Sequence, residues 1–238
     1  MNSRYIKIVA IVTMTIDHIG FFLFPDSNIF RIIGRIAMPL FAFLIAYGMT
    51  KTRDIKKYFW RLFIFAIVVQ VFFNLYIHND IFYIEHWNIL FTLALGVLAS
   101  GLIKTAITIS NDKSEMRLGR FLWIWVIIFG AITVIVSGVF FPIDYSMAGI
   151  LLVVLFYLAL LHSVKTLKIT AVASIVMFNI LLHWLYGTWL IQWWALLALP
   201  FILLFVDKKL KISKFEKYAF YVFYPLHFAL LHFISGFL

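Results

Sequence analysis

The sequence predicts an all-α integral membrane protein, a polytopic helical bundle that crosses the lipid bilayer about nine times. Hydrophobic residues make up 65% of the 238 residues, charged residues only 13%, and the mean hydropathy is +1.04. A water-soluble fold of this length would lack the polar surface needed to cover its core. In addition, most of the 20 Lys and Arg residues fall in every second gap between long apolar runs. This alternation is typical of multi-spanning membrane proteins.

The apolar runs are each long enough, at roughly 17 to 25 residues, to cross a hydrocarbon core of about 30 Å as a helix. We place them at 5–24, 29–50, 58–78, 88–109, 120–141, 146–163, 169–187, 189–206 and 218–236. No gap between them exceeds about a dozen residues, which leaves no room for a soluble domain. We therefore treat 1–238 as a single transmembrane domain.

Positive charge alternates from one gap to the next. The basic positions are Arg4 and Lys7 before the first run, then Lys51, Arg53, Lys56 and Lys57, then Lys113, Arg117 and Arg120, then Lys165 and Lys168, and finally Lys208, Lys209, Lys211, Lys214 and Lys217. Because Lys and Arg stay on the cytoplasmic side, the N-terminus is predicted inside and, after nine crossings, the C-terminus outside. We expect a multi-pass protein of the plasma membrane, in a bacterium. The pI is near 9.8, but membrane topology already explains these positive charges, so we expect no nucleic acid as a partner.

Ionisable side chains inside the apolar runs are candidates for a functional site, because each costs roughly 2.5 kcal/mol or more unless it is paired or hydrated. The first run contains Asp17 and His18, and the second contains Arg31 and Arg35, which lie on one helix face. Arg35 falls at a depth comparable to Asp17, which predicts an ion pair. Since Pro39 cannot donate a hydrogen bond to the carbonyl of Arg35, the second run should kink there.

Further polar residues accumulate in the predicted outer half of the bundle. They are Asn74 in the third run, Asn88 and Thr92 at the start of the fourth, and Tyr224 and His227 in the middle of the last. We interpret Asn74, Asn88, Thr92 and Tyr224 as candidate substrate-binding residues, with His227 as a second candidate catalytic histidine. Interhelical hydrogen bonds would explain Asn74, Asn88 and Thr92 equally well.

The residue types favour acid–base chemistry without a covalent enzyme intermediate. A histidine such as His18 can take a proton from an amine or hydroxyl. Cysteine is absent from the chain, which excludes disulfides and thiolate chemistry, and no Ser or Thr stands in an elbow-like motif. Asp17 would orient His18 or compensate its charge, while Arg35 would stabilise the cluster or a developing oxyanion. No His or carboxylate pair has the spacing of a helical zinc site, so we propose no metal.

Short motifs along the chain carry a family resemblance. They read IDHIGFF, FRIIGRIAMPLFAFLIAYGMTKTRD, WRLFIFAIVVQVFFN, NILFTLALG, PIDYSMAGILLVVLFYL, WWALLALPFILL and YAFYVFYPLHFALL. In this order they resemble the TraX family, multi-spanning proteins associated with N-acetylation of conjugative pilin. That family is similar to a wider transmembrane acyltransferase group that includes heparan-alpha-glucosaminide acetyltransferase. The resemblance implies His18, Asp17, Arg35 and His227 as site residues, whereas Tyr47 stands where relatives commonly carry an acidic residue.

We therefore expect an acyltransferase that moves an acyl group, expected to be acetyl, from cytosolic acyl-CoA to an amine or hydroxyl at the extracytoplasmic face. The acceptor would be a protein N-terminus, a peptide, a sugar or a lipid-linked glycan. The expected CoA-phosphate ligands are Lys51, Arg53, Lys56, Lys57 and Arg61, although the positive-inside rule would also account for the basic loop. Two alternatives stay open: a proton-coupled transporter or flippase that uses Asp17, His18 and His227 as a relay, and a non-catalytic membrane assembly factor.

Overall fold

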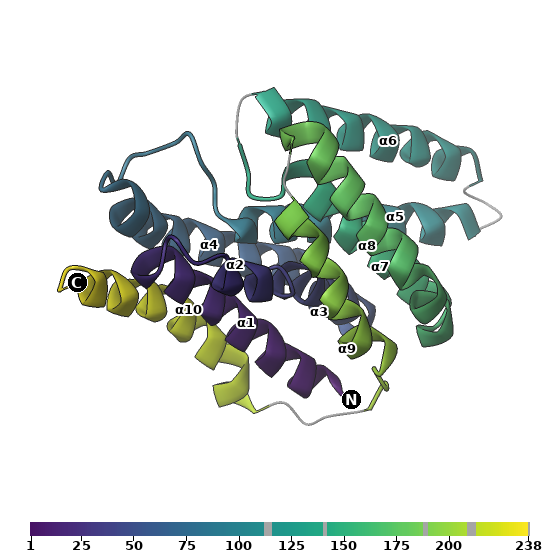
Figure 1. Cartoon of the computed structure of the whole chain (residues 1–238). Helices are drawn as coiled ribbons and strands as arrows, with labels where there is room; N and C mark the ends of the chain where they lie inside the picture. Colours follow the sequence, from purple (N-terminus) through teal and green to yellow (C-terminus); the bar gives the residue numbers. More distant parts are fainter. Residues whose placement is uncertain (112–115, 140–141, 188–189, 209–212, 238) are drawn as a thin grey trace.

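A computed structural model describes residues 1–111, 116–139, 142–187, 190–208 and 213–237 (Figure 1). The regular structure in this part of the chain is helical, apart from one isolated bridge between Trp87 and Ile143, and loops connect the helices. The α-helices are α1 (Ser3–Leu23), α2 (Asn28–Gly34), α3 (Ala37–Lys51), α4 (Ile55–Phe73), α5 (Ile89–Asn111), α6 (Met116–Val139), α7 (Ser146–His162), α8 (Val164–Tyr186), α9 (Leu199–Leu203) and α10 (Lys214–Ser235). A π-helix, η1 (Asn74–His78), follows α4, and a 3-10 helix, η3 (Leu190–Ala198), precedes α9. The predicted all-α class is confirmed.

The second predicted run is interrupted as expected. Helix α2 ends at Gly34 and α3 begins at Ala37, so the turn between them contains Arg35 and Ile36. This turn lies four residues before Pro39, where the missing N–H removes one helical hydrogen bond. The kink therefore lies at the arginine that the sequence marked as a buried charge.

The run at 189–206 differs from the single long helix that its hydropathy predicts. It forms the 3-10 helix η3 and then the short helix α9. Pro200 lies at the start of α9 and has no N–H to donate to the carbonyl of Leu196, which removes one hydrogen bond of a continuous α-helix and favours a break at this point. Residues 140–141 at the end of the fifth run, 189 at the start of the eighth, and Lys113, Lys209 and Lys211 lie outside the described residues.

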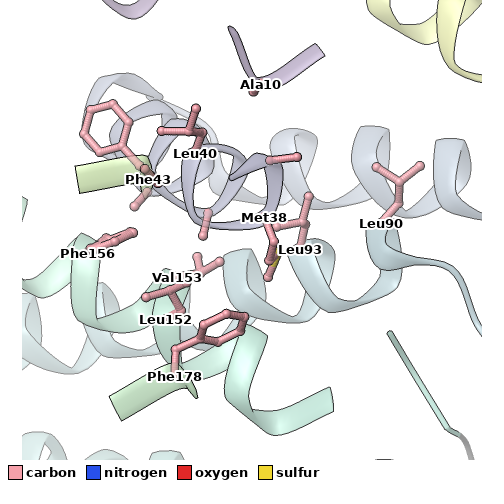
Figure 2. Packing of buried hydrophobic residues seen from close by; sticks show 14 of the residues in the cluster. Ala10, Met38, Leu40, Phe43, Leu90, Leu93, Leu152, Val153, Phe156 and Phe178 are labelled. Atoms are coloured by element: carbon pink, nitrogen blue, oxygen red, sulfur yellow. The ribbon is translucent and has the colours of Figure 1, made fainter. Parts of the chain in front are cut away.

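Helix α3 lies at the centre of the bundle and packs against α1, α5 and α7. Its side chains Met38, Leu40 and Phe43 are fully or almost fully buried. They belong to one apolar cluster with Val153 and Phe156 of α7, as Figure 2 shows. This packing fixes α3, and with it the turn that carries Arg35, against the rest of the bundle.

Large apolar side chains also cover the outside of the protein. Ile64, Ile67 and Val68 of α4 and Ile127 of α6 are all exposed, as expected of surfaces that face lipid instead of water. Among the described residues, five helices are long and apolar enough to cross a membrane, and they lie at Ser3–Leu23, Asn28–Lys51, Ile55–His78, Ile89–Thr108 and Val164–Tyr186. Three shorter apolar helices lie at Ser146–His162, Leu190–Leu203 and Tyr221–Ser235. The chain is therefore a helical membrane protein, while the count of nine crossings and their sidedness stay predictions.

Candidate functional site

Two histidines that are 209 residues apart in the sequence meet where α1 packs against α10. The Nδ1 atom of His18 lies 2.7 Å from Nε2 of His227. Their rings are stacked, with centroids 4.9 Å apart and an angle of 21° between the planes. Both of the histidines selected from the sequence therefore belong to one hydrogen-bonded pair.

The partners of this pair determine which nitrogens carry hydrogen when both rings are neutral. The Nδ1 atom of His227 lies 3.1 Å from the carbonyl oxygen of Phe223. A carbonyl only accepts, so Nδ1 of His227 must donate to it, and Nε2 of His227 is then an acceptor. His18 consequently donates from Nδ1 and keeps the lone pair on its own Nε2. The pair thus presents one basic nitrogen, Nε2 of His18.

Aromatic rings hold both imidazoles in place. The ring of Phe228 lies 4.5 Å from that of His18, and the ring of Phe223 stacks on that of His227 at 5.1 Å and an angle of 6°. Tyr224 packs edge-on against both, with its ring centroid 6.4 Å from His18 and 5.4 Å from His227. These apolar contacts restrict ring rotation, so the direction of the free lone pair is set by packing.

The predicted pair of Asp17 and Arg35 is present and includes a second arginine. Arg35 donates from Nη2 to Oδ1 of Asp17 at 3.2 Å, and Arg31 donates from Nη1 to Oδ2 at 3.0 Å. The close approach of α2 to α1 depends on a missing side chain, because a Cβ atom on Gly34 would overlap with Asp17. Glycine is therefore required where the two charged helices meet.

Arg35 is held on every guanidinium nitrogen. In addition to the bond with Asp17, its Nε donates to the carbonyl of Arg31 at 3.2 Å, and its Nη1 donates to Oη of Tyr145 at 3.4 Å and to Oε1 of Gln192 at 3.3 Å. Of the two roles expected for Arg35, this geometry supports stabilisation of the cluster. The geometry also differs from the expectation that Asp17 orients His18. Adjacent residues of a helix point in different directions, and His18 forms its hydrogen bond with His227.

A cavity of about 600 Å³ is lined by both His18 and the arginine cluster, a volume in the range of small-ligand sites. Its polar and charged lining residues are Asp17, His18, Arg31, Arg35, His78, His86, Asp144, Tyr145, Tyr186, Gln192 and Tyr224. Apolar side chains such as Met14, Phe21 and Leu93 line the remainder. One compartment can therefore bring a proton acceptor and a cationic group close to the same molecule.

One wall of the cavity comes from two loops that bind each other. Trp87 donates its amide to the carbonyl of Pro142, and Asp144 donates its amide to the carbonyl of Trp87, both at 2.9 Å. The side chains of His86 and Asp144 lie 2.9 Å apart. Since this hydrogen bond to a carboxylate favours the protonated imidazole, it raises the pKa of His86 above the usual 6.5.

Three of the candidate substrate-binding residues lie beside the cavity and bind the protein itself. Asn74 donates to the carbonyls of Ile81 and Tyr83 at 2.9 and 2.8 Å, and Asn88 donates to the carbonyl of Ala66 at 3.0 Å. Thr92 donates to the carbonyl of Asp144. These bonds position the loops that form the cavity wall. Tyr224 lines the cavity itself.

The five basic residues expected to bind CoA lie away from the cavity lining. Lys51 pairs with Asp207 at 2.7 Å, and Asp207 also accepts from the hydroxyl of Tyr47 at 2.6 Å. A carboxylate from another segment therefore lies beside Tyr47, the position at which relatives were expected to carry an acidic residue. Lys57 lies 3.5 Å from Asp54, Arg61 donates to the hydroxyl of Tyr221 at 3.1 Å, and Arg53 and Lys56 are exposed.

Sequence reasoning assigned no role to several polar residues that the structure brings to the cavity, among them Arg31, His86, Asp144 and Tyr145. Only Arg31 had a usable signal, its spacing of four from Arg35. The other three come from loops, where hydropathy carries no information on orientation. Among the described residues, no group of three or more His, Cys, Asp or Glu side chains gathers as a metal site.

The fold and the cavity together define a class: a helical membrane protein in which one cavity is lined by a histidine of a hydrogen-bonded pair and by an arginine–carboxylate cluster. The family model described as TraX protein matches residues 2–235, so the chain belongs to the TraX family. The resemblance noted in the sequence is thereby confirmed.

Two curated relatives match parts of the chain. This chain is 31% identical over 109 residues to the probable fimbrial assembly protein FimC, serogroup H1, of Dichelobacter nodosus, and the aligned part is 41% of this chain and 45% of the relative. It is also 43% identical over 67 residues to the uncharacterized protein RP591 of Rickettsia prowazekii (strain Madrid E), and the aligned part is 28% of this chain and 25% of the relative. The alignment thus spans less than half the length of either relative. No solved structure matches the chain.

Proposed function

We propose that this protein is an integral-membrane acyltransferase that moves an acyl group, expected to be acetyl, from acyl-CoA to an amine or hydroxyl. The observation that carries the proposal is the hydrogen-bond direction in the histidine pair, which leaves a lone pair on Nε2 of His18 beside a cavity of about 600 Å³. A general base that lines a cavity of this kind suits proton abstraction from a weakly acidic nucleophile.

In this mechanism, Nε2 of His18 takes the proton from the acceptor as its nitrogen or oxygen bonds to the thioester carbonyl carbon. The carbon–sulfur bond then breaks, and the proton passes from His18 to the leaving thiolate, so that free CoA and the acylated acceptor result. His227 stabilises the imidazolium that forms, because its Nε2 accepts a hydrogen bond from His18 throughout. Cationic side chains of the cavity would stabilise the negative charge on the carbonyl oxygen.

The basic residues Lys51, Arg53, Lys56, Lys57 and Arg61 remain our candidates for binding CoA phosphates. Since they lie outside the cavity lining, only the extended pantetheine arm would enter it. We propose that these residues face the cytoplasm and that the acceptor arrives from the extracytoplasmic side. The name of the Dichelobacter relative makes fimbrial subunits the first acceptors to test.

The decisive experiment measures thiol release from acetyl-CoA by the full chain in lipid nanodiscs, with fimbrial subunits, peptides and amino sugars as acceptors. His18→Ala should lower turnover by about 10² to 10⁴-fold, the usual range for loss of a general base. His162→Ala is the matched control, because His162 is exposed at the end of α7. Wild-type turnover in His18→Ala, or no acetyl-CoA consumption with any acceptor, would contradict the proposal.

The interhelical bond between His18 and His227 also supports a second candidate, a proton-coupled transporter or flippase. In that case, solute movement in liposomes would depend on a proton gradient and would not require acetyl-CoA. The third alternative, a non-catalytic assembly factor, draws support from the name of the Dichelobacter relative. Such a protein would keep its assembly function in the His18→Ala variant.

A further inference from the structure

The arginine cluster carries more positive than negative charge. One carboxylate, Asp17, accepts from two guanidinium groups, Arg31 and Arg35. The other carboxylate of the cavity, Asp144, hydrogen-bonds His86. Asp144 also interacts electrostatically with Arg35 and Asp17, but no ion pair joins it to Arg31 among the described residues. Arg31 therefore shares its one carboxylate with Arg35, and its charge is only partly compensated. An additional anion at this point would complete the cluster.

The partly compensated cation is Arg31, which shares Asp17 with Arg35. All three guanidinium nitrogens of Arg35 donate hydrogen bonds, whereas Arg31 donates only from Nη1 among the described residues. The side chain of Arg31 is 36% exposed, against 14% for Arg35. Its guanidinium carbon lies 5.9 Å from the ring centroid of Phe21, which also lines the cavity. A guanidinium held on one edge keeps its remaining N–H groups for a bidentate oxyanion contact.

A buried hydrogen-bond donor lies in the same region. Oε1 of Gln192 accepts from Arg35, because a guanidinium can only donate. The amide nitrogen of Gln192 consequently faces another direction, and it is buried without a partner in the described part of the chain. The residue is only 8% exposed and lines the cavity. An unpaired buried amide costs about 1–3 kcal/mol, a cost that an oxyanion would remove.

The geometry points to an acceptor that carries its own anionic group: Arg31, assisted by Gln192, binds a carboxylate, phosphate or sulfate of the acceptor while His18 deprotonates its nucleophile. This inference rests on the proposed acyl transfer and narrows its substrate class. All three residues line one cavity of about 600 Å³, so the anionic group and the nucleophile would belong to the same part of the acceptor. Neutral amines and alcohols would be poor acceptors.

The binding test needs no acyl transfer. The full chain in zwitterionic nanodiscs is titrated with succinate and with inorganic phosphate at constant ionic strength, and dissociation constants are taken from the rise in unfolding temperature. We expect saturable binding that weakens about tenfold or more in Arg31→Gln, since hydrogen bonds to a charged group contribute about 1.5–3 kcal/mol. Arg31→Lys should be intermediate because it keeps the charge and loses the planar fork.

Arg120→Gln is the matched control, because Arg120 is an exposed arginine of α6 outside the cavity. Anion binding that is equal in wild type and Arg31→Gln, or that falls equally in Arg120→Gln, would overturn the inference. Loss of the anion response in nanodiscs that contain phosphatidylglycerol would overturn the acceptor assignment, since a lipid headgroup would then occupy the site.

The acceptor test compares glycine with glycinamide, which share the amine and differ in the carboxylate. Wild-type protein should show a KM about tenfold or more higher for glycinamide, and Arg31→Gln should lose this preference. Equal KM values in wild type would overturn the inference. If neither compound is acylated and no other acceptor works, the proposed function fails, while the anion titration still decides whether Arg31 forms an anion site.

Discussion

The cluster of Asp17, Arg31 and Arg35 makes an ordered prediction about stability. Asp17→Asn leaves two guanidiniums facing each other without a carboxylate, in a place where the side chains of Asp17 and Arg35 are only 17% and 14% exposed. Removal of the shared partner from a buried charge pair costs on the order of 3 to 5 kcal/mol. We therefore expect Asp17→Asn to cause the largest loss of unfolding free energy in the cluster.

The two arginine variants should cost less and differ from each other. Arg35→Gln leaves Asp17 paired with Arg31, but it breaks the bonds to Tyr145 and Gln192, and we expect a loss of about 2 to 3 kcal/mol. Arg31→Gln leaves the pair of Asp17 and Arg35 intact. Since the Arg31 side chain is 36% exposed, its loss should cost about 1 kcal/mol or less.

The assay is reversible unfolding of the purified protein in mixed detergent micelles, followed by tryptophan fluorescence, with the double variant Asp17→Asn/Arg35→Gln completing a cycle. The double variant should cost about 1 to 3 kcal/mol less than the sum of the single variants. Arg120→Gln on the exposed face of α6 controls for the loss of a positive charge. Strict additivity, or a larger loss from Arg31→Gln than from Asp17→Asn, would refute this account of the cluster.

Three further predictions follow from single contacts. His227→Gln keeps a hydrogen-bond acceptor near Nδ1 of His18 but removes the second imidazole, so turnover should fall less than in His227→Ala and its pH profile should change. The hydrogen bond to Asp144 raises the pKa of His86 above 6.5, so this contact stabilises the cavity wall fully below about pH 6.5 and is lost as pH rises through the folded pKa. Amide exchange at the bridge between the two loops, corrected for intrinsic rates, should show this loss of protection. Asp144→Asn should abolish the pH dependence. Gly34→Ala should lower the unfolding temperature because its Cβ would overlap with Asp17, and an unchanged unfolding temperature would show that α1 and α2 can separate without cost.

The sequence by itself determined that the protein lies in lipid, where its helical segments are, and which two residues form the buried ion pair. Hydropathy runs located the helical segments, because only an apolar helix can satisfy its backbone in lipid, but they did not show that the run at 189–206 divides into η3 and α9. The depth of Asp17 and Arg35 along their runs, together with the position of Pro39, was sufficient to predict the pair and the kink. Rise per residue is the same in every α-helix, so depth can be calculated without knowledge of the packing.

The tertiary structure alone decided which helices are neighbours and how each is rotated about its axis. The contact of His18 with His227 requires α1 to lie against α10. The second arginine at Asp17 requires the close approach that Gly34 permits. Which helices become neighbours in lipid depends on how well their small and large side chains fit together. Burial of apolar surface against protein gains little free energy over its contact with lipid tails. Hydropathy therefore locates a helix and its charges, while interhelical packing determines which side chains form the cavity.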